Sequence, residues 1–189
     1  MILQDIINII ESVAPLSYQE SWDNSGLQVG DRNAEVHAAL LTVDVTESVV
    51  NEAIEKHCDL IISHHPLIFR GLKQITGSTT QERCIEKAIR HNIAIYSSHT
   101  SMDVYLHGVS GKIADKLDII NYHILCPTTD DNVGLGVIGE LKTPMKSDDF
   151  IHFVQNIFDC SLRYIKPCDE NITTVAICGG AGAEFITQA

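Results

Sequence analysis

The stretch DLIISHHP, residues 59–66, decides the fold, because a short apolar strand ends there in two histidines and a proline. A second strand of this kind is predicted at IAIYSS, residues 93–98, and a third, also buried, at ALLTVD, residues 39–44. Helical patterns separate the three strands. Residues 46–57 form one of them, and Thr79 opens the other, with Glu82 completing a capping box. Short strands that alternate with helices pair in parallel through crossover connections, so the sequence predicts an α/β fold.

The flanking segments extend this pattern at both ends of the chain. Apolar residues at helical spacing predict a first helix over residues 2–13, and SWDNSGLQVG, residues 21–30, is expected to be a shaped turn. Towards the C-terminus we expect helices at 109–118 and at 147–158, and Ser147 caps the second of them. We expect strands at 133–141, 161–165 and 173–178. A glycine turn at 179–182 is expected to open a last helix. The change of texture places a domain boundary near residue 125, giving a metal-binding α/β domain at 1–124 and the start of a second α/β domain at 125–189.

The pattern at the end of the chain suggests that the natural protein continues. The last helical pattern ends at Ala189 after about two turns, with neither a Gly or Asn stop nor a basic last turn. So short a helix gains little stability without later elements to pack against. We therefore expect the second domain to be incomplete in residues 1–189.

Composition excludes several classes of protein. The hydrophobic content of 44% supports a sizeable core, and the formal net charge of −12 argues against a nucleic-acid partner. The six cysteines form no C-x-x-C pair, so we expect free thiols in a reducing compartment; they are Cys58, Cys84, Cys126, Cys160, Cys168 and Cys178. Acidic residues interrupt the apolar N-terminal run, which therefore predicts neither a signal peptide nor a membrane span, and places the protein in the cytoplasm.

Two polar clusters follow neighbouring strands of the predicted sheet. His64 and His65 come directly after residues 59–63, and His99 and Asp103 follow residues 93–98. In open α/β sheets, ligands collect beyond the carboxyl ends of the strands, so the two clusters are expected to face one crevice. Imidazole and carboxylate together suit divalent ions such as Zn, Fe or Mn.

Each of these residues also has a simpler interpretation. Neighbouring side chains on a strand point to opposite faces, so His64 and His65 share one ion only if the backbone bends; otherwise each serves its own ion. Pro66 restricts His65 to extended conformations. Asp103 could cap a helix or a turn, and His99 could be a hydrogen-bond partner of the ligands instead of a ligand.

Four stretches occur in an order that identifies a family resemblance: WDNSGLQVG, LLTVDVT, DLIISHHPLIF and YSSHTSMDV. Together they resemble the dinuclear metal-centre family known as GTP cyclohydrolase 1 type 2 homologues, or Nif-three-like proteins. SHHPLIF is the most specific of the motifs. The resemblance runs from Glu20 to the end of the chain.

The resemblance implies two interlinked α/β domains around mixed sheets, two divalent metal ions and a homohexamer. It implies that His64, His65 and Asp103 are metal ligands, and His99 matches a histidine beside them. If His99 is not a ligand, it is the candidate catalytic residue and could move a proton. The family also has a late Gly-His-x-x-x-Glu pattern, which residues 1–189 do not contain. The function to expect is that of a metal-dependent hydrolase acting on an unknown small molecule. The alternative is a non-catalytic metal-binding scaffold or regulatory interaction protein.

Overall fold

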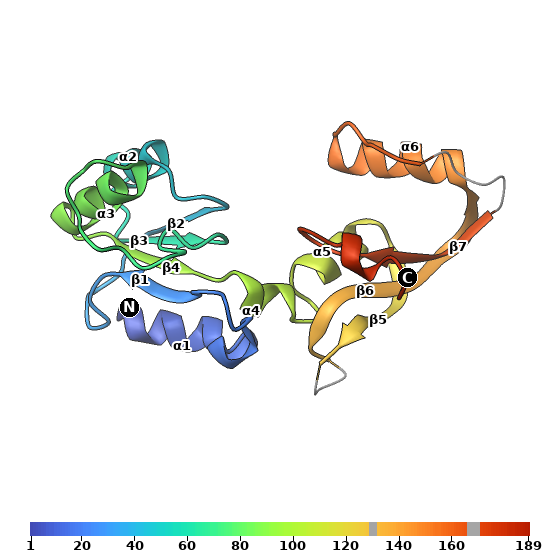
Figure 1. Cartoon of the computed structure of the whole chain (residues 1–189), viewed down its shortest axis with the longest axis horizontal. Coiled ribbons are helices and arrows are strands. Elements are labelled where there is room, and N and C mark those ends of the chain that lie inside the picture. The colour runs from blue at the N-terminus through green and yellow to red at the C-terminus, as the bar shows by residue number, and fades with distance from the viewer. Residues whose placement is uncertain (129–131, 166–170) are drawn as a thin grey trace. The chain divides into compact units, whose positions relative to one another are not determined.

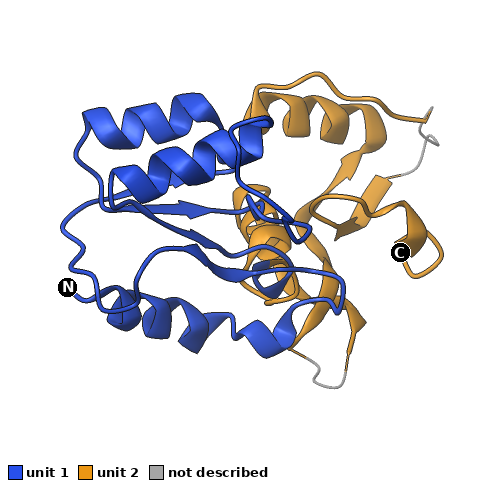
Figure 2. Cartoon of the chain, turned by 60° about the vertical axis from the view of Figure 1, so that its left-hand side comes forward, with its two compact units in different colours: residues 1–102 blue, residues 103–189 orange. Residues whose placement is uncertain are grey.

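The computed structural model describes residues 1–128, 132–165 and 171–189 and divides into two compact units, Met1–Met102 and Asp103–Ala189 (Figure 2). Each unit contains its own β-sheet, one of four strands and one of three. This arrangement confirms the predicted α/β class with two sheets, of which the sheet of unit 1 is mixed and the sheet of unit 2 is antiparallel. The sequence pattern placed a domain boundary near residue 125, a position that lies inside strand β5 (Ile119–Pro127) of unit 2.

The sheet of unit 1 has the order β1-β4-β3-β2 (Figure 1). Strands β2 (Ala39–Thr42), β3 (Leu60–Ser63) and β4 (Ala94–Ser97) run parallel, as predicted, and β1 (Gly26–Val29) is antiparallel to β4. Ser63 at the end of β3 is in register with Ser97 at the end of β4. The residues that follow these two strands therefore emerge side by side at one edge of the sheet.

Helices cover both faces of this sheet. Helices α2 (Glu47–Glu55) and α3 (Thr80–Arg90) lie on one face, and α1 (Leu3–Val13) lies on the other (Figure 1). Alternation along the strands divides the core between the faces, because Ile61 and Ile95 pack under α2 and α3 whereas Leu60 and Tyr96 pack on α1. A short 3-10 helix, η1 (Leu16–Tyr18), leads from α1 towards β1.

Two expectations for unit 1 are wrong in detail. β2 was expected to be buried, but it pairs only with β3 among the described strands, and Leu41 is 77% exposed. Residues 26–29 were expected to belong to a turn, but they form β1, which a backbone pairing with β4 stabilises without a long apolar run.

The predicted cap at Thr79 is present, because its side chain accepts a hydrogen bond from the Glu82 N–H at 3.2 Å.

Unit 2 is built on the antiparallel sheet β5-β6-β7, with β6 at Gly134–Lys146 and β7 at Asn171–Ile177. Helices α5 (Val109–Lys116) and α6 (Ser147–Phe158) pack against it, with a core that includes Ala114, Leu117, Ile124 and Val137. The short helix α4 (Thr100–Asp103) lies where the two units join along the chain. Among the described residues no helix has the length and apolar character needed to cross a membrane.

Several expectations for unit 2 need correction. Strand β5 was not predicted, and its backbone is irregular, because Asn121 has a φ of 53° and the register with β6 shifts between Ile120 and His123. Residues 161–165 form no strand, the last predicted helix is only the 3-10 turn η2 (Ala183–Phe185), and Ser147 is the first helical residue of α6 instead of its cap. The five cysteines that the structure describes are free, as predicted, whereas Cys168 lies outside the described residues.

Candidate metal centre

The ends of β3 and β4 are held together by two buried serines. The hydroxyls of Ser63 and Ser97 lie 2.8 Å apart, and the Ser63 hydroxyl donates to the carbonyl oxygen of His65 at 2.9 Å. The chain therefore bends directly after the strand, and the alternation of a straight strand no longer applies to His64 and His65. The bend allows two neighbouring histidines to present their rings on the same side.

Three imidazole rings meet at this edge. The ring centroids of His64 and His65 are 5.0 Å apart, and His99 lies 5.3 Å from the first and 5.5 Å from the second. One ligand atom from each of the three residues lies within 4.8 Å of the other two. His64, His65 and His99 therefore form a group that could hold a metal ion.

Each ring is oriented by a hydrogen bond at its Nδ1 atom. The acceptor is the Ser98 carbonyl for His64, at 3.0 Å, the Asp44 carboxylate for His65, at 2.7 Å, and the Asp23 carboxylate for His99, at 2.8 Å. Carbonyl and ionised carboxylate oxygens only accept, so each Nδ1 carries the proton and the lone pair of the neutral ring is on Nε2. Histidines that bind metals have this arrangement, so the donor set fits a divalent ion.

Asp23 is the most enclosed of the orienting groups. Its side chain is fully buried, and its oxygens accept hydrogen bonds from the hydroxyls of Ser25 and Thr100 and from the N–H groups of Asn24 and Thr100, besides His99. Burial alone would raise the pKa of Asp23, but the hydrogen bonds from Thr100, His99, Ser25 and Asn24 outweigh it and lower the pKa to about 2. The carboxylate is thus ionised near neutral pH and holds the His99 ring in place.

Sequence reasoning did not identify Asp23 or Asp44 as part of this site. Asp23 lies 76 positions before His99, and Asp44 lies 21 positions before His65. Asp44 is the last residue of the strand predicted at 39–44 and lies just beyond the observed β2, as His64 lies just beyond β3, so the carboxyl-end rule would have identified it. Asp23 belongs to a segment that was expected only to turn, and nothing in its spacing pointed to His99.

Asp103, the third predicted ligand, is the last residue of α4 and the first residue of unit 2. It does not cap the next helix, because the N-cap of α5 is Gly108. Its assignment as a ligand therefore remains a prediction.

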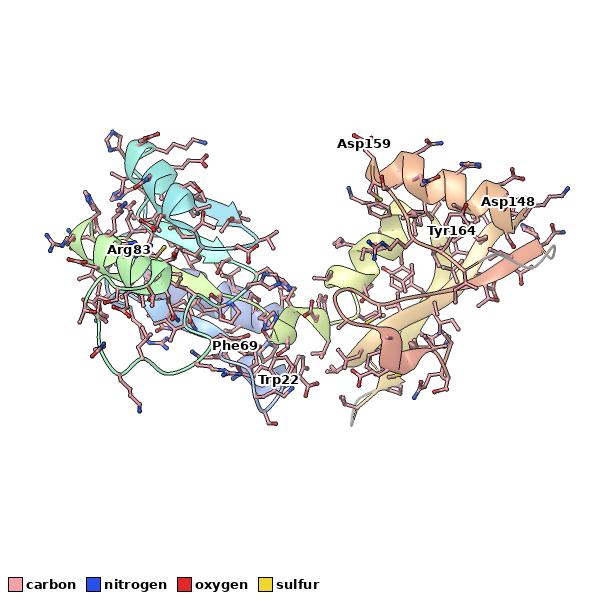
Figure 3. All side chains as sticks on the ribbon, turned by 45° about the horizontal axis from the view of Figure 1, so that its top comes forward. Trp22, Phe69, Arg83, Asp148, Asp159 and Tyr164 are labelled. Atoms are coloured by element: carbon pink, nitrogen blue, oxygen red, sulfur yellow. The ribbon has the colours of Figure 1, made fainter. Side chains whose placement is uncertain are left out.

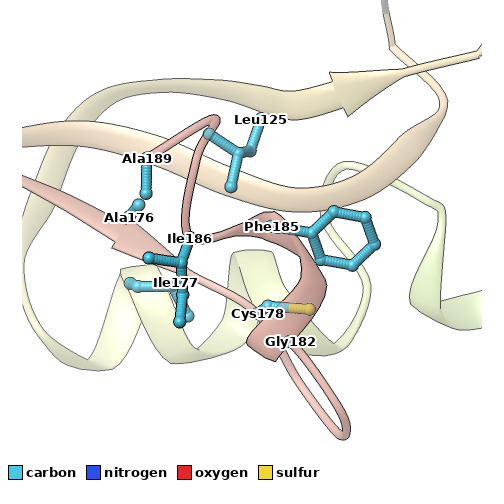
Figure 4. A pocket seen from close by; sticks show the side chains of 8 residues that line it. All are labelled: Leu125, Ala176, Ile177, Cys178, Gly182, Phe185, Ile186 and Ala189. Atoms are coloured by element: carbon cyan, nitrogen blue, oxygen red, sulfur yellow. The ribbon is translucent and has the colours of Figure 1, made fainter.

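Unit 2 contains a pocket of about 150 Å³, and the residues that line it lie between Leu125 and Ala189. Ile177, Cys178, Phe185 and Ile186 belong to its lining, which contains no charged side chain (Figure 4). None of the residues that line this pocket is a histidine.

Comparisons with known proteins agree on one family. A family model described as Duf34/NIF3 (NGG1p interacting factor 3) matches residues 1–189. A protein of Clostridium acetobutylicum named GTP cyclohydrolase 1 type 2 homolog is 37% identical over 99% of this chain and 71% of its own length. NIF3-like protein 1 of Drosophila melanogaster is 34% identical over 97% of this chain and 65% of its own length.

Solved structures show the same fold. A Staphylococcus aureus protein superposes with a TM-score of 0.91 and 30% identity, covering 100% of this chain and 75% of the other. A Bacillus cereus protein related to NIF3 superposes with a TM-score of 0.92 and 25% identity, covering 100% of this chain and 79% of the other.

Proposed function

Because the chain belongs to the Duf34/NIF3 family, we propose that it is a metal-dependent hydrolase in which His64, His65 and Asp103 hold two divalent ions. The observation that carries the proposal is the orientation of three imidazoles by three separate Nδ1 acceptors, with their ligand atoms within 4.8 Å of one another. A histidine that only fills space in a core does not need such an arrangement. Imidazole favours Zn or Fe, and the Asp103 carboxylate extends the choice to Mn.

When bound, the ions would supply Lewis acidity for the hydrolysis of a small molecule. The residues of the chain would do the remaining work. Asp23 keeps the proton of His99 on Nδ1, so that Nε2 can accept a proton from the attacking water and later return it to the leaving group. The names of the relatives point to a cyclohydrolase acting on a purine nucleotide, and this substrate class is part of the proposal.

Elemental analysis of the purified protein, together with a panel of hydrolase substrates, tests the proposal. We expect bound Zn, Fe or Mn, and a hydrolytic activity that chelation abolishes and the metal restores. Activity that is indifferent to chelators would contradict the hydrolase mechanism. Bound metal without activity on any substrate would favour the alternative function, a non-catalytic scaffold or regulatory interaction protein. The homohexamer implied by the resemblance stays a prediction, which light scattering can check.

Replacing His99 separates a ligand from a residue that moves protons. In the proposed role, His99→Ala lowers turnover about 100-fold or more while the protein keeps most of its bound metal, because the remaining ligands are intact. Turnover and metal content measured on the same preparation decide the matter. Loss of metal in parallel with loss of activity would instead make His99 a ligand.

A further inference from the structure

Two exposed aromatic side chains lie next to the histidine group. Trp22 is 57% exposed and Phe69 is 44% exposed, although both are large apolar groups. Figure 3 labels the two side chains close to one another. Their ring centroids are 6.0 Å apart, with the planes tilted by 59°. We call Trp22 and Phe69 the aromatic pair. Leaving this much aromatic surface in water forgoes the free energy of burial, so the pair calls for a functional explanation.

Hydrogen bonds hold the aromatic pair in place. The residue before Phe69 is fixed at both of its backbone groups, because the Ile68 carbonyl accepts from the Asn24 side chain at 2.6 Å and the Ile68 N–H donates to Gln28 at 2.9 Å. The Gln81 side chain donates to the preceding carbonyl, that of Leu67, at 2.6 Å. Asn24 also lies two residues from Trp22, so it ties the loop of one aromatic residue to the loop of the other. A pair held in this way loses little conformational entropy when it binds a ligand.

The aromatic pair continues into the candidate metal centre. The His99 ring lies 6.1 Å from the Trp22 ring and 6.5 Å from the Phe69 ring, edge-on to both. The same His99 ring lies 5.3 Å from the His64 ring and 5.5 Å from the His65 ring. A ligand that rests on the aromatic pair would therefore lie beside His99, which itself belongs to the histidine group.

We propose that Trp22 and Phe69 form the substrate platform of this site and bind the flat face of an unsaturated ring, such as a heteroaromatic base. An aliphatic ligand would gain only from area removed from water, which leucine or isoleucine would supply equally well. Because the planes of the two rings are tilted by 59°, a planar ligand would stack on one ring and meet the other nearer its edge, and both arrangements stabilise aromatic pairs. The role of this platform in substrate binding rests on the proposed function, whereas its binding of planar rings can be measured without it.

Trp22 is the only tryptophan of the chain, so its fluorescence reports directly on the platform. We expect adenosine and guanosine to quench this fluorescence in a saturable manner, and ribose, which lacks the base, to leave it unchanged. Phe69→Leu should weaken nucleoside binding about tenfold, because one stacking partner is lost. The matched control is Tyr164→Leu, which removes another exposed aromatic side chain, in unit 2, and should have no effect.

The Trp22→Leu variant needs a different measurement because it lacks the reporter. Equilibrium dialysis with labelled adenosine should show a loss of at least about tenfold in affinity, with an unchanged circular dichroism spectrum. Quenching by ribose equal to that by nucleosides, or full binding by both variants, would overturn the proposal. Acrylamide quenching of Trp22 at two protein concentrations is a further check. If Trp22 is shielded at the higher concentration and exposed after dilution, a second copy of the chain covers the aromatic pair, and the proposal is overturned.

Metal content measured on the same samples separates this proposal from the proposed function. A metal-loaded protein that binds no nucleoside would overturn the platform and leave the metal centre intact. Nucleoside binding by a protein that takes up none of Zn²⁺, Fe²⁺ and Mn²⁺ would support the platform and overturn the metal-dependent function.

Discussion

His65→Ala is expected to lower the affinity of the protein for Zn²⁺ by more than about 100-fold. Removing only a hydrogen-bond partner of a ligand typically weakens metal binding about 10- to 100-fold, and removing the ligand itself should cost more. The fold should survive, because the His65 side chain is 49% exposed and lies beyond the end of β3. Competition with a chromophoric chelator measures the affinity, and circular dichroism checks the fold.

His37→Ala is the matched control for this experiment. His37 is also an exposed histidine of unit 1 beside a carboxylate, with its Nδ1 atom 3.4 Å from Asp59. Among the described residues, His37 belongs to no group of side chains that could hold a metal ion. Its removal should therefore leave the Zn²⁺ affinity unchanged. Equal affinities for the wild type and His65→Ala would show that the histidine group is not the metal site.

Asp23→Asn is expected to lower the free energy of unfolding by about 3 kcal/mol and to lower turnover about 10- to 100-fold, while Zn²⁺ binding is kept. Every partner of the Asp23 oxygens is a donor, and an amide replaces one acceptor by a further donor. Buried donors, including one on Ser25 or Thr100, would then lack an acceptor. His99 would lose the group that fixes its proton on Nδ1, and with it the orientation of Nε2.

The lowered pKa of Asp23 supports this magnitude. A shift from 3.8 to about 2 corresponds to roughly 2 kcal/mol of stability, because the ionised form is favoured in the folded protein. This contribution is fully present above about pH 4 and is lost as the pH falls through about 2. Urea denaturation of the metal-free protein measures it. The control is Asp5→Asn, which changes an exposed carboxylate of α1 and should shift stability by less than about 0.5 kcal/mol. Equal effects of the two substitutions would contradict the role assigned to Asp23.

Local sequence determined the parallel strands of unit 1, the helices between them and the proximity of His64 and His99. The apolar runs at 59–63 and 93–98 contain enough β-branched residues to specify strands. The helical patterns between them specify the crossovers that make these strands parallel. Parallel strands end at the same edge, so the proximity of His64 and His99 followed from the pattern alone. Where strands are specified by pairing instead of composition, as in β1 and β5, the sequence pattern was not sufficient.

Only the tertiary structure decided how the three rings are oriented and what lies around them. At the bend, the Ser63 hydroxyl contacts the hydroxyl of Ser97, which is 34 residues away, and the Nδ1 acceptor of His99 is 76 residues away. Hydrogen bonds of this kind act between side chains that chain folding brings together, and they leave no periodic trace in the sequence. The same reason explains why Trp22 and Phe69 did not stand out as a pair. Each lies in a loop of its own, and the hydrogen bonds of Asn24 and Gln28 to Ile68 join the two loops beside the histidines.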